Sequence, residues 1–256
     1  MLLSQSVGGA GRVTDILMNS GFSTRDTMRY MMKRKIAINA SRYFLVGLVI
    51  FLSGCGRTLP TEKTIEVPFT SQAPAGDWSE PWQNACEEAS IYMISSFYAG
   101  DEIKQAEAIQ RIHEIFVAKA ENFTVSKDES LQTITELIDT LDLPIDTHIV
   151  YDPTIDQLKT ELSLGNPIIV PVYAPQLSSV YSVAGGADYH VIVLVGYNDT
   201  DEMFLINDPG TAGGEGVLIP YDTFMNAIHD LDVNDYLAGK KAVLFTQRET
   251  EFDWFK

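Results

Sequence analysis

Apolar residues recur at helical spacing through one part of the chain and form short continuous runs through the part that follows. The strongest helix is predicted to begin at Asn84, a good N-cap, with Glu87 three residues later as in a capping box, and to end at Gly100. Its apolar residues lie on every side, which indicates a helix buried on most of its faces. Three more helices are predicted. The first covers residues 101–120, and the second begins at a capping box of Ser126 and Glu129 and ends at about Leu141. The third begins at Asp152 and Pro153 and ends at about Gly165.

The later apolar runs are rich in Val, Ile, Leu and aromatic residues, which favours β-strands. Strands are predicted over residues 167–173, 189–197, 203–206, 217–221 and 242–246, with a short helix over 222–230. Residues 65–70 contain Pro68 and are compatible with one more strand at the edge of the sheet. Helices followed by an antiparallel sheet are the α+β arrangement, and the roughly 200 residues after Cys55 are enough for one domain.

A basic cluster, Lys33-Arg34-Lys35, precedes an apolar run over residues 43–52 that is too short to span a membrane, which takes roughly 20 residues. Basic residues, a short apolar run and small residues after it are typical of an export signal. The sequence that follows, Leu52-Ser53-Gly54-Cys55, resembles a bacterial lipobox, in which the cysteine receives lipid and becomes the new N-terminus. We therefore predict an exported protein, anchored by lipid on Cys55 to the outer face of the bacterial cell membrane.

These patterns divide the chain into five parts. Residues 1–31 have no periodic apolar pattern and are predicted to precede the true start of translation, near Met32. Residues 32–54 are predicted to form the signal peptide, 55–64 a polar tether, 65–247 the folded domain and 248–256 a C-terminal tail.

The charge of the chain is strongly acidic, with a formal value of −17. Residues 1–54 hold seven of the 18 basic side chains and two of the 35 acidic ones, which leaves 11 basic and 33 acidic residues and a charge of −22 for the rest. Nucleic acid is therefore not an expected partner, because phosphate binding needs clustered Lys and Arg. Cationic peptides would suit this charge, although solubility at a cell surface explains it as well.

Cys86 is the second of two cysteines, and lipid on Cys55 would leave it without a disulfide partner. A thiol attacks as the thiolate, and a position at the start of a helix favours the anion. The negative charges of Glu87 and Glu88 oppose that effect, so a neighbouring imidazolium would have to supply the remaining stabilisation of the thiolate. Position alone leaves two interpretations open, a reactive nucleophile and a buried, inert thiol.

His190 and Asp208 are the candidate partners of this thiol. His190 opens an apolar strand after a loop of small residues, which suits a catalytic base and equally a core histidine with satisfied hydrogen bonds. Asp208 follows the next strand in a turn sequence, and pairing of the two strands would bring it near His190, where a carboxylate holds the imidazole in one tautomer. The other histidines are predicted to be surface or packing residues: His113, His148 and His229.

Five short segments occur in the order seen in a known family. They are VPFTSQ at residues 67–72, CEEAS at 86–90, GNPI at 165–168, HVIVLVG at 190–196 and NDP at 207–209. Together they resemble the bacteriocin-processing, or double-glycine-peptidase-like, family of papain-like cysteine peptidases, over about residues 65–246. The resemblance implies a papain-like α+β fold, in which the helix that carries the cysteine packs on an antiparallel sheet that carries the histidine and the aspartate.

The resemblance also implies roles for individual residues. Cys86 would be the nucleophile, His190 the base and Asp208 the residue that orients it. Gln72 would match the family glutamine that stabilises the oxyanion together with the Cys86 amide. Its separation from Cys86 is long because residues 73–82 look inserted, which leaves Gln83 as the alternative.

The predicted function is a cell-surface cysteine peptidase that acts on a peptide or protein substrate. Two alternatives stay open: a peptide-binding module on the same fold that no longer turns over, and a cell-wall amidase, which commonly has a second histidine where this chain has Asp208. No metal or other cofactor is expected. Residues 230–235 begin like a calcium loop but have Asp235 where glycine is needed, and the glycine-rich residues 210–216 lead into a strand, which disfavours phosphate binding.

Overall fold

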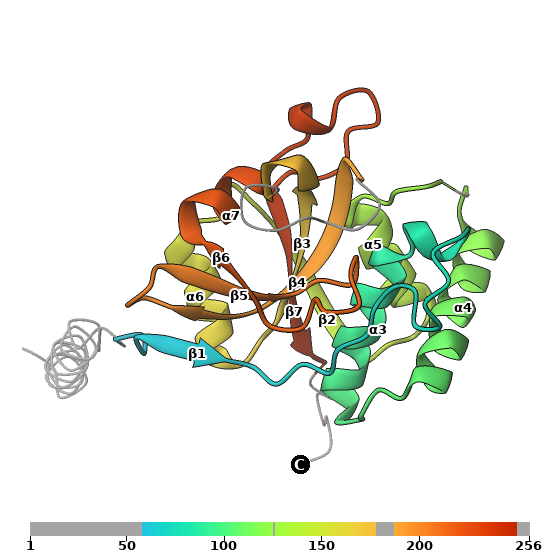
Figure 1. Cartoon of the computed structure of the whole chain (residues 1–256), viewed down its shortest axis with the longest axis horizontal. Helices are drawn as coiled ribbons and strands as arrows, with labels where there is room; N and C mark the ends of the chain where they lie inside the picture. The colour runs from blue at the N-terminus through green and yellow to red at the C-terminus, as the bar shows by residue number, and fades with distance from the viewer. Residues whose placement is uncertain (1–57, 125, 178–186, 250–256) are drawn as a thin grey trace, which may run out of the picture. The chain divides into compact units, whose positions relative to one another are not determined.

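The computed structural model describes residues 58–124, 126–177 and 187–249, and all helices and strands named below lie in the compact unit Leu59–Lys256. The predicted signal peptide, the predicted lipidation site at Cys55 and most of the C-terminal tail lie outside the described residues. Seven strands of the described region form one antiparallel sheet in the order β2-β7-β3-β4-β5-β6, and β1 pairs with β4 (Figure 1). The strands are β1 (Glu62–Thr64), β2 (Ile145–Tyr151), β3 (Ile168–Tyr173), β4 (Tyr189–Asn198), β5 (Met203–Asn207), β6 (Val217–Pro220) and β7 (Ala242–Arg248).

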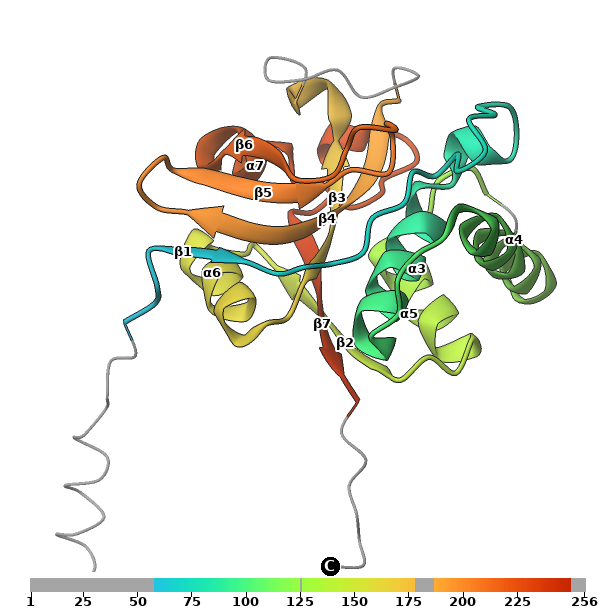
Figure 2. The same cartoon turned by 60° about the horizontal axis from the view of Figure 1, so that its bottom comes forward.

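The helices gather in two places around the sheet. Figures 1 and 2 show α3 (Cys86–Ala99), α4 (Gln105–Asn122) and α5 (Leu131–Thr140) together on one side, with α3 packed against β4. The short helices α6 (Ile155–Leu164) and α7 (Tyr221–Ala227) lie beside the other half of the sheet. This arrangement confirms the predicted α+β fold.

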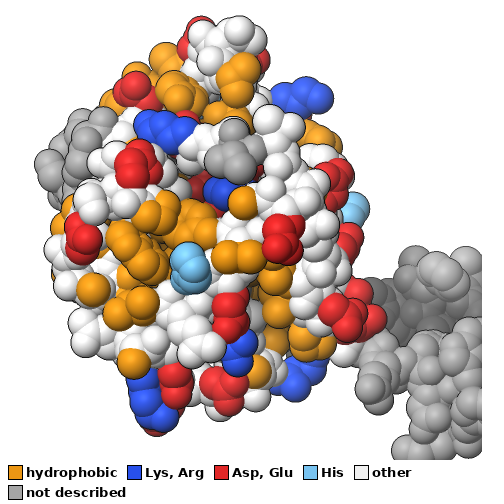
Figure 3. All heavy atoms as spheres, turned by 90° about the vertical axis from the view of Figure 1, so that its right-hand side faces the viewer, with side chains coloured by type: hydrophobic (Ala, Val, Ile, Leu, Met, Phe, Trp, Pro, Cys, Tyr) orange, Lys and Arg blue, Asp and Glu red, His pale blue; other side chains and the backbone are white. Residues whose placement is uncertain are grey.

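The surface on the α4 side carries a mixture of side chains. In Figure 3 hydrophobic side chains gather around a histidine, and the acidic and basic side chains are scattered singly around them. In the part of the chain that the structure describes, no helix is both long and apolar enough to cross a bilayer.

Strand β4 is the centre of the domain. It pairs with β3 along its first half and with β1 along its second half, while β5 lies on its other side. The close approach of β1 requires Gly196, because a Cβ there would collide with the backbone oxygen of Lys63. All residues of β4 except Asn198 are buried, which explains why the sequence shows a continuous apolar run instead of an alternating one.

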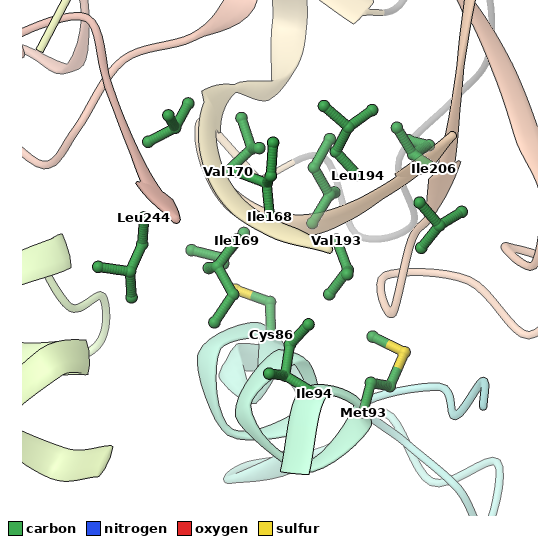
Figure 4. Close-up of a cluster of buried hydrophobic side chains, with 14 of the residues drawn as sticks. Cys86, Met93, Ile94, Ile168, Ile169, Val170, Val193, Leu194, Ile206 and Leu244 are labelled. Carbon is green, nitrogen blue, oxygen red and sulfur yellow. The ribbon is translucent and has the colours of Figure 1, made fainter. Parts of the chain in front are cut away.

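The core lies between α3 and the central strands. Figure 4 shows Met93 and Ile94 of α3 facing the strand residues Ile168, Ile169 and Val193. Burial of a side chain of this size contributes about 1.5–3 kcal/mol, so this contact stabilises α3 on the sheet.

The predicted N-cap of α3 is wrong. Residues Trp82–Asn84 form a 3₁₀ turn, Ala85 occupies the cap, and Cys86 is the first residue of the helix. The Asn84 side chain is held in the preceding turn, where its Nδ2 donates to Glu80 Oε1 at 2.6 Å. The predicted end is confirmed, since Gly100 has a φ of 78° and its N–H closes the last turn.

Other boundaries differ from the prediction by a few residues. Helix α5 is capped by Ser130, which accepts from the Thr133 amide, while Ser126 donates to the Glu129 carboxylate ahead of the helix. Helix α6 is capped by Thr154 with a capping box to Gln157, so the turn at Asp152 and Pro153 precedes the helix.

The strand predicted over residues 65–70 is also wrong. β1 ends at Thr64, and only the Ile65 amide continues the pairing, with the Val195 carbonyl at 2.8 Å. Pro68 has no amide hydrogen to donate, which is consistent with the end of the strand before it.

Candidate active site

The structure joins His190 to Asp208. His190 is the second residue of β4, Asp208 follows directly after β5, and the pairing of Val193 with Asn207 brings the two strands into register. His190 Nε2 lies 2.5 Å from Asp208 Oδ1, and both side chains are buried. A carboxylate only accepts, so Nε2 carries the hydrogen and Nδ1 is the nitrogen able to take a proton. The predicted proximity of the two residues is therefore confirmed, while their catalytic role stays a prediction.

Cys86 lies beside the strand that carries His190. The backbone N–H of Val191 contacts the Cys86 thiol, and the Ser90 hydroxyl, one helical turn later, reaches the Val191 carbonyl at 3.5 Å. One face of α3 thus lies along the residue next to His190. This contact places the nucleophile and the base predicted from the sequence on adjacent elements.

The thiol itself is hydrogen-bonded to a carboxylate and not to the imidazole. Cys86 Sγ donates to Glu87 Oε2 at 3.0 Å, and no hydrogen bond joins Cys86 to His190, both of which the structure describes. Figure 4 shows the Cys86 side chain directed from α3 toward the apolar side chains of the sheet. The thiol is in a resting position in which it keeps its proton.

Of the two interpretations that position left open, a reactive nucleophile and a buried thiol, this conformation fits the buried one. Cys86 is only 5% exposed, and burial raises its pKa well above the ordinary value. The negative charge of Glu87 and the hydrogen bond to it raise the pKa further, whereas the Val191 amide acts in the opposite direction. Its place at the start of α3 does not outweigh these effects.

A cluster of buried charges lies behind the thiol. Glu88 is paired with Lys119, whose ammonium also lies 3.6 Å from Glu129 Oε1. The Glu129 amide donates to Glu87 Oε1 at 2.9 Å, so both oxygens of Glu87 have partners. Burial, together with the charge of Glu88, raises the pKa of Glu87 to about 7. Burial raises the pKa of Glu88 as well, against the opposing charge of Lys119.

The sequence carried a signal for this cluster that the prediction did not use. A helix that is apolar on every side must bury any acidic residue that it also carries, and a buried carboxylate needs partners. Glu87 and Glu88 stand in such a helix, and Lys119 lies on the neighbouring one.

Gln72 lies close to the site, with both hydrogens of its amide engaged. Its Nε2 donates to the carbonyls of Trp82 and Gln83, at 3.0 and 2.8 Å, and its backbone amide donates to Pro209. Gln72 therefore ties the residues ahead of Cys86 to the turn that follows Asp208. Gln83 is exposed and donates to Glu80, so it lies outside this network. The oxyanion role of either glutamine stays a prediction.

A groove of about 460 Å³ opens beside Gln72. The inserted residues form one wall with Trp78, Phe69 lies ahead of them, and Ile103 and Ala212 come from other parts of the chain. Ala212 belongs to the loop that follows Asp208, whereas Cys86, His190 and Asp208 themselves do not line the groove.

The remaining histidines lie apart from this site. His113 and His148 are exposed and His229 is buried, as predicted for surface or packing residues. Within the described ranges, no group of three or more His, Cys, Asp or Glu residues is arranged to hold a metal ion.

The model of the Peptidase_C39 like family matches residues 64–238. A crystal structure assigned to a C39-like peptidase from Bacillus anthracis is 18% identical, covers 73% of this chain and 99% of its own, and has a TM-score of 0.45. Xylellain, a cysteine protease from Xylella fastidiosa, is 14% identical, covers 75% of this chain and 87% of its own, and has a TM-score of 0.41. No curated protein matches the sequence.

Proposed function

Because the chain belongs to the Peptidase_C39 like family, we propose that it is a cysteine peptidase with Cys86 as nucleophile, His190 as base and Asp208 as the residue that orients the base. One observation carries this proposal, the hydrogen bond from His190 Nε2 to Asp208 Oδ1. His190 lies on β4, and the start of α3, where Cys86 stands, contacts the same strand. A buried carboxylate on Nε2 leaves Nδ1 as the acceptor, which is what a base for a thiol requires.

The reaction begins when the Cys86 side chain leaves Glu87 and turns toward His190. Nδ1 takes the thiol proton, and the thiolate attacks the substrate carbonyl carbon to give a tetrahedral oxyanion. The first amides of α3 have no partner within the helix, and we propose that the Cys86 amide stabilises that oxyanion. The imidazolium then gives its proton to the leaving amine, and the acyl group stays on Cys86 as a thioester.

Water completes the cycle. His190 takes a proton from a water molecule, which attacks the thioester carbonyl, and the thiol leaves with the proton that the imidazolium returns. The net change is hydrolysis of one peptide bond, and Asp208 keeps the imidazole in the same tautomer through both halves.

The substrate is a peptide or protein. The groove beside Gln72 offers Phe69, Trp78 and Ile103, which suits an apolar side chain of the substrate. We further propose that the domain acts outside the cell, held at the membrane by lipid on Cys55.

A peptide library tests the proposed activity. Wild type should hydrolyse a subset of its peptides, whereas Cys86→Ala and His190→Ala should lose the activity while circular dichroism shows that both remain folded. Retained hydrolysis in Cys86→Ala would overturn the assignment.

A second candidate function, peptide binding without turnover, is favoured by the bond from the thiol to Glu87. Peptides that bind wild type and Cys86→Ala equally, with no cleavage by either, would support it. Release of muropeptides from peptidoglycan would instead support an amidase.

A further inference from the structure

Asp208 Oδ1 accepts two hydrogen bonds. One comes from His190 Nε2 at 2.5 Å and the other from the Gly210 amide at 2.7 Å. The orientation of the carboxylate, and through it that of the imidazole, therefore depends on where the Gly210 amide lies.

Gly210 also lies directly against the imidazole ring. A Cβ at this position would stand 2.8 Å from His190 Nε2, 2.9 Å from Cε1 and 3.1 Å from Asp208 Oδ1. Real Cβ atoms hardly ever approach a ring atom this closely, so the buried His190 ring would have to shift to admit one. Gly210 is not among the glycines with positive φ, so space and not backbone conformation requires glycine here.

The rest of the turn fixes Gly210 in place. The Asp208 amide donates to the Gly214 carbonyl at 2.8 Å, and a Cβ on Gly214 would overlap the Asp208 carbonyl oxygen. On the other side the Gln72 amide donates to the Pro209 carbonyl at 2.9 Å. The glycine-rich residues 210–216, whose sequence disfavours phosphate binding, thus surround the aspartate.

We propose that Gly210 is a positioning residue for the base: its amide orients Asp208, and its missing side chain lets the Nε2 edge of His190 pack against the turn. This inference rests on the proposed peptidase function, because Gly210 positions a base only if His190 acts as the base of that site. Gly210→Ala would push the ring away from the carboxylate and release Nδ1 from its defined orientation.

The chain supplies a matched control in the same loop. A Cβ on Gly213 would meet no atom within 4 Å, and Gly213 also lies outside the positive-φ glycines, so Gly213→Ala adds the same methyl group without a collision. Any effect common to both variants comes from the loop in general and not from the contact with His190.

Nitrogen-15 spectra of the full chain, labelled at histidine and glycine, test the geometry without reference to activity. Wild type and Gly213→Ala should show His190 as the Nε2–H tautomer with a downfield, slowly exchanging ring proton, and Gly210→Ala should lose that signal. On a peptide that wild type cleaves, Gly210→Ala should lower kcat about 10-fold or more with little change in KM.

Two results would overturn the proposal. One is a Gly210→Ala spectrum with the wild-type tautomer and ring proton; this result would not depend on whether any peptide is cleaved. If Gly210→Ala does not fold, Asp208→Asn gives the second test: the His190 ring and Gly210 amide signals should shift together, because one oxygen accepts both bonds. Independent behaviour of the two signals would contradict the inference.

Discussion

Replacement of Glu87 by glutamine should activate the Cys86 thiol. Glu87 Oε2 accepts the thiol hydrogen at 3.0 Å, and its other oxygen accepts from the Glu129 amide. A glutamine can keep its oxygen on the Glu129 amide and present its NH₂ group to the sulfur, which turns an acceptor into a donor. The thiolate would then gain a hydrogen bond and lose a neighbouring negative charge.

The size of the effect follows from this contact. A hydrogen bond to a charged group contributes about 1.5–3 kcal/mol, and because about 1.4 kcal/mol is a factor of ten, the thiolate population should rise about 10- to 100-fold. A more acidic thiol is intrinsically less nucleophilic, with a Brønsted coefficient of about 0.5, so the alkylation rate should rise about 3- to 10-fold.

The assay is the rate of iodoacetamide alkylation of Cys86 at pH 8 and at pH 6. The pKa of Glu87 is raised to about 7, so wild type carries the carboxylate at pH 8 and the neutral acid at pH 6. Glu87→Gln should therefore exceed wild type clearly at pH 8, and the difference should narrow at pH 6.

Glu129→Gln is the matched control for this comparison. Its side chain belongs to the same buried cluster and pairs with Lys119 and Ser126, but it does not contact the thiol. The reasoning fails if Glu87→Gln is alkylated no faster than wild type at pH 8, or if Glu129→Gln raises the rate as much.

Further predictions concern stability, the groove and the membrane anchor. The folded state keeps a proton on Glu87 between the ordinary pKa of 4.5 and about 7, so wild-type stability in urea should fall by about 3 kcal/mol as the pH rises through that window. Glu87→Gln should show a much smaller fall, which comes from Glu88 alone. Gln72→Ala should lower turnover about 10²-fold, because Gln72 holds the residues ahead of Cys86 or donates to the oxyanion. Gln83→Ala should leave turnover unchanged, and the reverse result would assign the oxyanion role to Gln83. Trp78→Ala should raise KM about 10-fold for peptides with a bulky apolar residue and leave smaller peptides unaffected, since an apolar side chain of this size contributes about 1.5–3 kcal/mol. Metabolic labelling with a fatty acid should mark wild type and not Cys55→Ser, and equal labelling of both would refute lipidation.

The sequence could predict those parts of the fold that depend on local pattern. The strands around His190 were correct because their continuous apolar runs reflect burial on both faces. The end of α3 at Gly100 is predictable because glycine tolerates the left-handed conformation that closes the helix, and its φ is 78°. Helix starts were less predictable, because Ser130 and Thr154 compete with nearby polar residues for the same amides, and the choice depends on the preceding turn.

Contacts of the candidate site that follow from the pairing of strands were predictable from the sequence. Contacts that depend on the direction of a single side chain were not. The pairing of β4 with β5 brings Asp208 to His190 whatever their rotamers. The bond from Cys86 to Glu87 depends on how one buried side chain turns, and the role of Gly210 depends on a contact distance. No sequence pattern reports either quantity.

The central claim is that Cys86 forms a thioester with its substrate with the help of His190. Peptides that wild type cleaves should be mixed with the full chain, quenched in acid within the first turnover, and examined by intact mass and peptide mapping. The account predicts an acyl adduct on Cys86 in wild type, much slower adduct formation in His190→Ala, and none in Cys86→Ala. Cleavage by wild type with no adduct on Cys86, and undiminished cleavage by Cys86→Ala, would contradict it.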